Sequence, residues 1–130
     1  MVGDQHLLMN VALLSEGTGR IKVTLSAQWI GSDLVVLLFN EQGHIGAVAL
    51  ADYSHAENRA STSVVTRLGH RDDSVAYNAA YKLCKQLQKP VCALAGLHLD
   101  DITGEEIAQI SRNCDTLVER LGRQLSAGSF

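Results

Sequence analysis

The residues best suited to chemistry are three histidines at the ends of expected structural elements. His44 begins a short apolar stretch, His70 directly precedes an expected helix, and His98 follows a short expected strand. Imidazole nitrogens, together with nearby carboxylates, are good ligands for divalent transition metals. The chain has no HxxxH pair, so a metal site at these histidines would have to assemble through tertiary contact. A divalent metal is therefore one open expectation.

Residues 69–73, Gly-His-Arg-Asp-Asp, are the strongest candidate for anion binding. The first backbone N–H groups of a helix have no partner within it and lie at the positive end of its dipole, so they favour a phosphate. His70 and Arg71 would add charge-assisted donors. The alternative interpretation is a capped helix start with solvated charges, in which the two aspartates compete with an anion.

The hydroxyl cluster at residues 61–63, Ser-Thr-Ser, is a second candidate for phosphate contacts. Ser61 and Ser63 can donate hydrogen bonds to phosphate oxygens, although such clusters are also typical of a loop entering an edge strand. The sequence contains no P-loop, no GxGxxG fingerprint and no GxSxG nucleophile motif. We therefore expect a protein that is not an enzyme.

The first half of the chain is rich in expected strands. Residues 20–29 alternate apolar and polar side chains, which predicts a strand with one wet face. Residues 34–39 form an apolar run typical of a central strand, and residues 44–50 form the next strand of a meander. Residues 6–14 fit either a strand or a helix, and residues 52–60 are expected to form a loop.

The second half changes to helical periodicity. A strand over residues 61–68 is followed by apolar residues spaced three and four apart, with Asp72 or Asp73 as the N-cap and Pro90 as the stop. Residues 91–95 form a short buried strand. Thr103 and Glu106 then have the spacing of a capping box at the start of a last helix, which is expected to reach the tail at 126–130.

These elements predict an α+β fold with a mostly antiparallel sheet and two helices packed on one face. The 130 residues suit a single domain, 1–130. Exposed sheet edges in so small a domain predict a homo-oligomer, with a two-fold dimer favoured.

Composition excludes several classes of function. A net charge of -3 and 5% aromatic residues disfavour a nucleic-acid partner, which needs basic groups and stacking platforms. No apolar run approaches the roughly 20 residues of a membrane span, and no secretory signal begins the chain. Three widely spaced cysteines predict buried thiols rather than disulfides, so a cytoplasmic location fits best.

Four segments in order carry a family resemblance: HIGAVA at 44–49, STS at 61–63, LGHRDD at 68–73 and AGLHLD at 95–100. Together they resemble the prenylated-flavin chaperone family. These are the small accessory D subunits that accompany UbiD-type phenolic-acid decarboxylases, described as having a bacterial relative of the proteasome-assembly-chaperone fold. The resemblance extends over roughly residues 21–121.

The resemblance implies a non-catalytic carrier that binds reduced prenylated FMN and helps deliver it to an apo-decarboxylase of the UbiD type acting on aromatic acids. Six candidate cofactor contacts come with it: His44, Ser61, Ser63, His70, Arg71 and His98. Such a carrier needs an apolar shelf, an anion anchor and modest affinity. Any ring stacking would fall to Trp29 or Tyr53, and neither belongs to a matching segment.

Two alternatives from other functional classes stay open. One is a cofactor-free assembly or interaction module. The other is a small metal-dependent enzyme using His44, His70 and His98.

Overall fold

The computed structural model describes residues 10–68 and 72–127. Its described parts form one six-stranded sheet, two α-helices and a short 3-10 turn. The strands are β1 (Asn10–Glu16), β2 (Val23–Ile30), β3 (Asp33–Phe39), β4 (Ala47–Ser54), β5 (Arg59–Thr66) and β6 (Val91–Gly96). The helical elements are η1 (Gly19–Ile21), α2 (Asp73–Leu87) and α3 (Gly104–Ala127).

The strand order corrects the expected sheet. The strands lie in the order β1-β2-β3-β6-β4-β5, and β3 pairs with β6 in parallel. The other four pairings are antiparallel. The α+β class is right and most of the pairings are antiparallel, but the sheet is mixed, because β3 and β6 are parallel. The expected three-strand meander is wrong, because β4 does not pair with β3.

The connection between β3 and β4 explains why the expected meander does not form. Consecutive strands are neighbours in most sheets, which is the premise of the meander. Here residues 40–46 between β3 and β4 span the width of one strand, and β6 occupies the space between them. β6 returns to that space after α2, so β3 and β6 run in the same direction.

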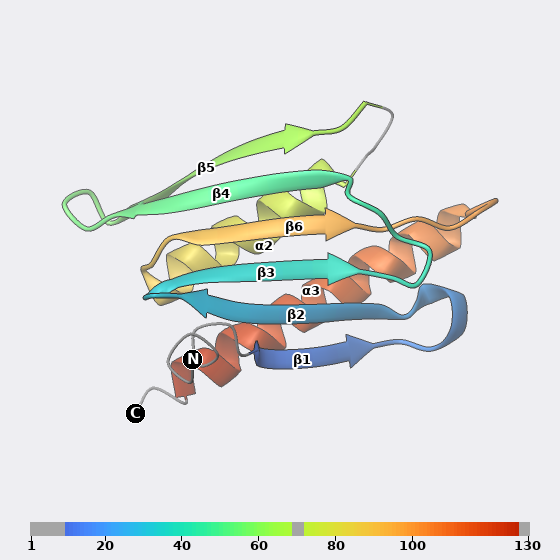
Figure 1. Ribbon diagram of the computed structural model, residues 1–130, viewed down its shortest axis with the longest axis horizontal. Coiled ribbons are helices and arrows are strands. Elements are labelled where there is room, and N and C mark those ends of the chain that lie inside the picture. The colour runs from blue at the N-terminus through green and yellow to red at the C-terminus, as the bar shows by residue number, and fades with distance from the viewer. Residues whose placement is uncertain (1–9, 69–71, 128–130) are drawn as a thin grey trace, which may run out of the picture.

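Both helices cover the same face of the sheet, as Figure 1 shows, with α2 over β4, β5 and β6 and α3 over β1 and β2. The side chains of this covered face alternate along each strand, and many of those on β2, β3, β4 and β6 are fully buried. They include Val23, Leu25, Leu34, Val36, Leu38, Val91 and the alanines of β4 and β6. Small alanines on the sheet let α2 lie close to it, through its own alanines at 76, 79 and 80.

All three cysteines are free thiols, and two of them are buried in this core. Desolvation by burial is the main reason that the pKa of Cys114 rises to about 12, and it also raises the pKa of Cys84. These two thiols act as small apolar side chains. Cys92 is only partly buried.

The helices begin and end where the sequence predicts. The capping box forms, because Glu106 N–H donates to Thr103 Oγ1 at 3.1 Å and Thr103 N–H donates to Glu106 Oε1 at 3.0 Å. α2 ends at Leu87 with Gln88 in the left-handed conformation, before Pro90. Neither helix in the described ranges is long and apolar enough to cross a membrane.

Two expectations about the strands change. The described part of the N-terminal segment is strand β1, and residues 6–9 lie outside the described residues. The expected loop over 52–60 is mostly a hairpin: β4 continues to Ser54, a turn follows, and β5 begins at Arg59. Asn58 takes the positive φ of 54° that this turn requires.

Candidate functional site

The candidate site lies at the carboxyl ends of the parallel strands β3 and β6, where ligands commonly bind in sheets with parallel strands. Asn40 follows β3, His98 comes two residues after β6, and His44 precedes β4. β4 runs antiparallel to β6, so its first residue, Ala47, lies beside Ala95 at this same end. Two chain segments distant in sequence, the 40–46 connection and the loop after β6, therefore meet here.

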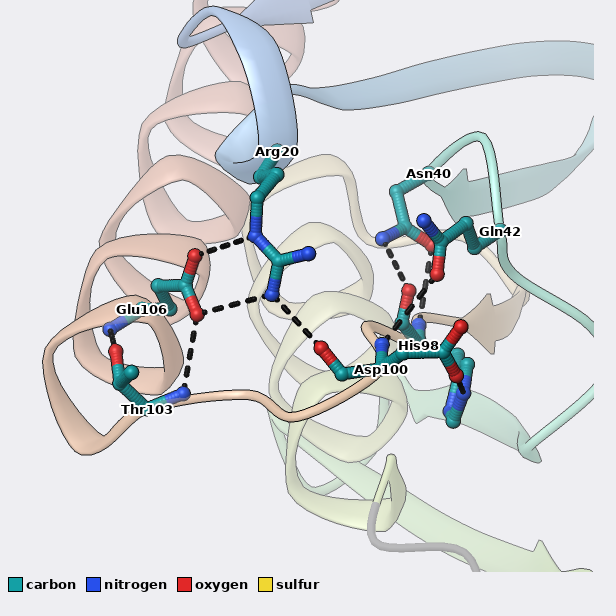
Figure 2. Close-up of polar contacts among 7 residues, drawn as sticks. All are labelled: Arg20, Asn40, Gln42, His98, Asp100, Thr103 and Glu106. Carbon is teal, nitrogen blue, oxygen red and sulfur yellow. Dashed lines mark hydrogen bonds and ion pairs between the residues drawn. The ribbon is translucent and has the colours of Figure 1, made fainter.

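Asn40 fixes the main chain of His98, as Figure 2 shows. Its amide Nδ2 donates to the carbonyl oxygen of His98 at 2.8 Å, and its Oδ1 accepts from the His98 N–H at 3.1 Å. Asn40 is 6% exposed, so both bonds are shielded from water. The side chain thus continues the β3–β6 ladder past the end of the strands and positions His98. Sequence reasoning missed this residue, although a polar residue directly after a buried strand is a usable signal.

The rest of the β6–α3 loop is held from η1 and α3 (Figure 2). Arg20 donates through Nη2 to the carbonyl oxygen of Asp100 at 2.8 Å and forms an ion pair from Nε to Glu106 Oε2, also at 2.8 Å. Hydrogen bonds from Arg20 and from Thr103 lower the pKa of Glu106 to about 2. The loop that carries His98 is therefore tied at both of its ends.

The His44 and His98 rings stack at this end of the sheet. Their centroids are 5.3 Å apart, with the ring planes 30° from parallel. His98 Nε2 lies 3.0 Å from Asp100 Oδ1, so the carboxylate orients that imidazole. Two of the sequence-predicted site residues are thereby brought together, with a carboxylate beside them.

Three glycines make the close packing of this site possible. A Cβ at Gly43 would overlap the carbonyl oxygen of Gly96, and a Cβ at Gly96 would lie 2.5 Å from the carbonyl oxygen of His44. Both obstacles are backbone atoms, which cannot swing aside. A Cβ at Gly46 would overlap the Asp72 carboxylate. Glycine is required here because segments touch, which explains why small residues surround the histidines in the sequence.

Asp72, the residue before α2, points away from the helix it precedes. Its carboxylate makes no capping bond to α2, and its Oδ2 accepts instead from the N–H of Leu97 at 3.2 Å. The side chain is buried between α2, β4 and β6. Asp72 is the N-cap residue of α2, as expected, but its side chain makes no capping bond, so this carboxylate does not occupy the first N–H groups of the helix.

The predicted serines lie elsewhere on the sheet. Ser63 pairs with Leu50 and Ser61 with Asp52, on edge strand β5. At about 3.3 Å per residue, Ser61 is roughly 17 Å along the strand from the end where the histidines meet. Ser61 instead lines a shallow hollow of about 370 Å³ on the β4–β5 hairpin with Asp52 and Arg59.

The expected stacking residues also lie away from the histidines. Trp29 pairs with Leu34 at the beginning of β3, and Tyr53 is near the end of β4, so both are at the opposite end of the sheet. Lys89 Nζ lies 5.7 Å from the centre of the Trp29 ring, and His55 packs edge-on against Tyr53. An aromatic ring nearer the histidines is Phe39, which pairs with Gly96 and is 38% exposed.

His70 and Arg71 lie outside the described residues, so their expected roles stay predictions. Among residues 10–68 and 72–127, no three His, Cys, Asp or Glu side chains form a group that could hold a metal ion. The metal site expected at His44, His70 and His98 depends on His70 and is not tested by the described residues.

Comparison with known proteins identifies the family. The model of the prenylated flavin chaperone LpdD-like domain matches residues 17–126, which is most of the chain. This chain therefore belongs to the LpdD-like prenylated flavin chaperone family. No curated protein matches its sequence.

A similar fold occurs in a solved structure. The crystal structure of a novel chaperone complex for yeast 20S proteasome assembly contains a chain that is 11% identical, with a TM-score of 0.58. The match covers 92% of this chain and 98% of the yeast chain. At that identity the likeness shows a shared fold, the proteasome-assembly-chaperone-like fold that the resemblance implied.

Proposed function

We propose that this protein binds reduced prenylated FMN as cargo and delivers it to an apo-decarboxylase of the UbiD type that acts on aromatic acids. The observation that carries the proposal is the family match over residues 17–126. In this role the protein is a non-catalytic carrier, and its chemistry is binding and release.

The phosphate anchor is proposed at the amino end of α2. The first N–H groups of that helix favour an anion, and the Asp72 carboxylate is bonded to Leu97 instead of to them. His44 and His98 stack at the same end of the sheet as the glycine that contacts Asp72. His70 and Arg71, which directly precede Asp72 in the sequence, complete the proposed set of donors. Neutralising a dianionic phosphate by several donors is worth about 1.5–3 kcal/mol per charged hydrogen bond.

The isoalloxazine ring is proposed to lie near Phe39. This side chain is 38% exposed at the end of β3, and its partner Gly96 carries no side chain that would keep a flat ring away. An open shelf of this kind suits a carrier, because a site that does not enclose its ligand releases it readily.

Calorimetry under reducing, anaerobic conditions tests the anchor. FMN is expected to bind at least tenfold more tightly than riboflavin, since only FMN offers the phosphate. His98→Ala should remove much of that difference. His55→Ala, an exposed histidine on the β4–β5 hairpin, is the matched control and should change nothing. Equal affinity for FMN and riboflavin would contradict a phosphate anchor.

Delivery is tested with a UbiD-type apo-decarboxylase. The protein loaded with reduced prenylated FMN should activate the apo-enzyme faster than the same concentration of free cofactor, because the carrier protects it from oxidation. A rate equal to that with free cofactor would contradict delivery and leave only binding.

A further inference from the structure

The face of the sheet opposite the helices is apolar, and no described element covers it (Figure 1). We call it the open face and define it by its apolar side chains: Leu13, Val35, Leu37, Phe39, Val48, Leu50, Val65, Cys92 and Leu94. Several of them are strongly exposed, with Leu13 at 66%, Leu50 at 57% and Val65 at 73%. Large contiguous apolar patches of this kind mark interaction surfaces in soluble proteins.

The pairing register makes the open face continuous. One row of facing residues crosses all six strands, and five of its six members are apolar: Leu13, Ser26, Leu37, Leu94, Val48 and Val65. A second row places Val35, Cys92 and Leu50 side by side on the three central strands. The apolar side chains of the open face therefore form one continuous surface and are not scattered singly over the sheet.

We propose that the open face is the dimer interface of this protein, covered by the open face of a second copy. Two sheets packed face to face would form a sandwich with the helices outside, and their side chains would interdigitate across about 10 Å. Phe39, beside which the flavin ring is proposed to lie, is the last residue of β3, so the flavin site adjoins the open face at its margin. The tests below use the protein without cofactor and do not depend on cofactor binding. The sequence predicted a dimer from the exposed sheet edges, whereas this proposal places the dimer contact on the face of the sheet.

Area and charge both favour a second copy as the occupant. Six strands about 4.8 Å apart and about seven residues long present roughly 600 Å² per copy, so a pair covers about 1,200 Å², within the range of specific interfaces. Formal charges on this face of the strands, at Asp33, Asp52 and Arg59, all lie toward one end of the sheet. The centre carries no charge, so an identical surface can approach it without repulsion, as in the cores of homodimer interfaces.

Light scattering on the full chain tests the proposal. The wild type is expected at twice the 14.0 kDa chain mass at micromolar concentration, and Leu50→Asp at 14.0 kDa with an unchanged circular dichroism spectrum. Ile107→Asp is the matched control, because Ile107 on α3 is 55% exposed and Leu50 is 57% exposed. This control should stay dimeric. A monomeric wild type, or a dimeric Leu50→Asp, would overturn the proposal.

The Cys92 thiol gives a second measurement that needs no variant. Cys92 lies on the open face between Val35 and Leu50, whereas Cys84 and Cys114 are buried in the core. Alkylation of Cys92 should be slow in the concentrated protein and accelerate on dilution as the dimer dissociates. A rate that does not depend on protein concentration contradicts the proposal, as does protection that appears only when an apo-decarboxylase is added.

Discussion

Replacing Asn40 by alanine is expected to destabilise the protein and to loosen His98. The substitution removes two hydrogen bonds, from Nδ2 to the His98 carbonyl oxygen and from the His98 N–H to Oδ1. Each is worth about 1 kcal/mol net, and the total rises toward about 4 kcal/mol if the two main-chain groups stay dry without a partner. Since Asn40 is 6% exposed, water reaches this position poorly and a loss of at least about 2 kcal/mol is expected.

Thermal unfolding followed by circular dichroism measures this loss. With an unfolding entropy of about 2.1 cal/mol/K per residue, 130 residues give about 0.27 kcal/mol/K, so 2 kcal/mol lowers the midpoint by about 7 °C. Gln42→Ala is the control on the same loop, because its single bond to the Asp100 N–H is long, at 3.4 Å, and exposed. We expect Gln42→Ala to stay within about 2 °C of the wild type.

The Asn40→Asp variant distinguishes the effect of losing the hydrogen-bond donor Nδ2 from the effect of losing side-chain volume. The aspartate keeps the shape and still accepts from the His98 N–H, but its second oxygen faces the His98 carbonyl oxygen. The variant should be least stable at neutral pH and recover relative to the wild type as protonation at low pH restores a donor. An Asn40→Ala midpoint equal to that of Gln42→Ala would refute the reasoning, since the two bonds would then contribute nothing.

Three further predictions test the packing and the charges. Gly43→Ala should destabilise the protein strongly, since its Cβ would overlap the Gly96 carbonyl oxygen, whereas Gly104→Ala, with open space around it, should unfold at the wild-type midpoint or above. Leu117→Ala should cost about 2–5 kcal/mol in urea unfolding, because Leu117 is fully buried, against under about 1 kcal/mol for the exposed Ile107→Ala. The pKa of Glu106 is lowered from 4.5 to about 2, so its stabilisation is present above pH 4.5 and is lost as pH falls toward 2. Glu106→Gln should therefore unfold below the wild type near neutral pH and together with it at pH 2, and a gap that stays constant with pH would contradict this assignment.

Local patterns in the sequence predict the local elements well. The capping box at Thr103 and Glu106 forms as expected because it depends on residues three apart. α2 likewise follows from its apolar spacing and from Pro90. The strand expected from residue 20 begins only at Val23, because the chain forms the 3-10 turn η1 over Gly19–Ile21 although its residues continue the alternation.

Non-local features are what the sequence does not show. β6 lies between β3 and β4 by pairing with residues at least 40 positions earlier in the chain, and no local pattern encodes that pairing. The candidate site residues give a second example of a non-local feature. His44 and His98 are 54 positions apart and meet, whereas Ser61 and Ser63 are closer to His44 in sequence and lie farther along the sheet. Asn40 was missed because its hydrogen-bond partner is the main chain of a residue 58 positions away, so only its own place directly after a buried strand indicates its role.

Anaerobic titration of the protein with reduced prenylated FMN, followed by absorbance and native mass spectrometry, tests the carrier function most directly. We expect saturable binding that adds the mass of one cofactor per chain, and transfer of that mass to an added UbiD-type apo-decarboxylase. A protein that stays colourless and retains no flavin after reconstitution would contradict the proposed function, and would favour the alternative of a cofactor-free assembly module.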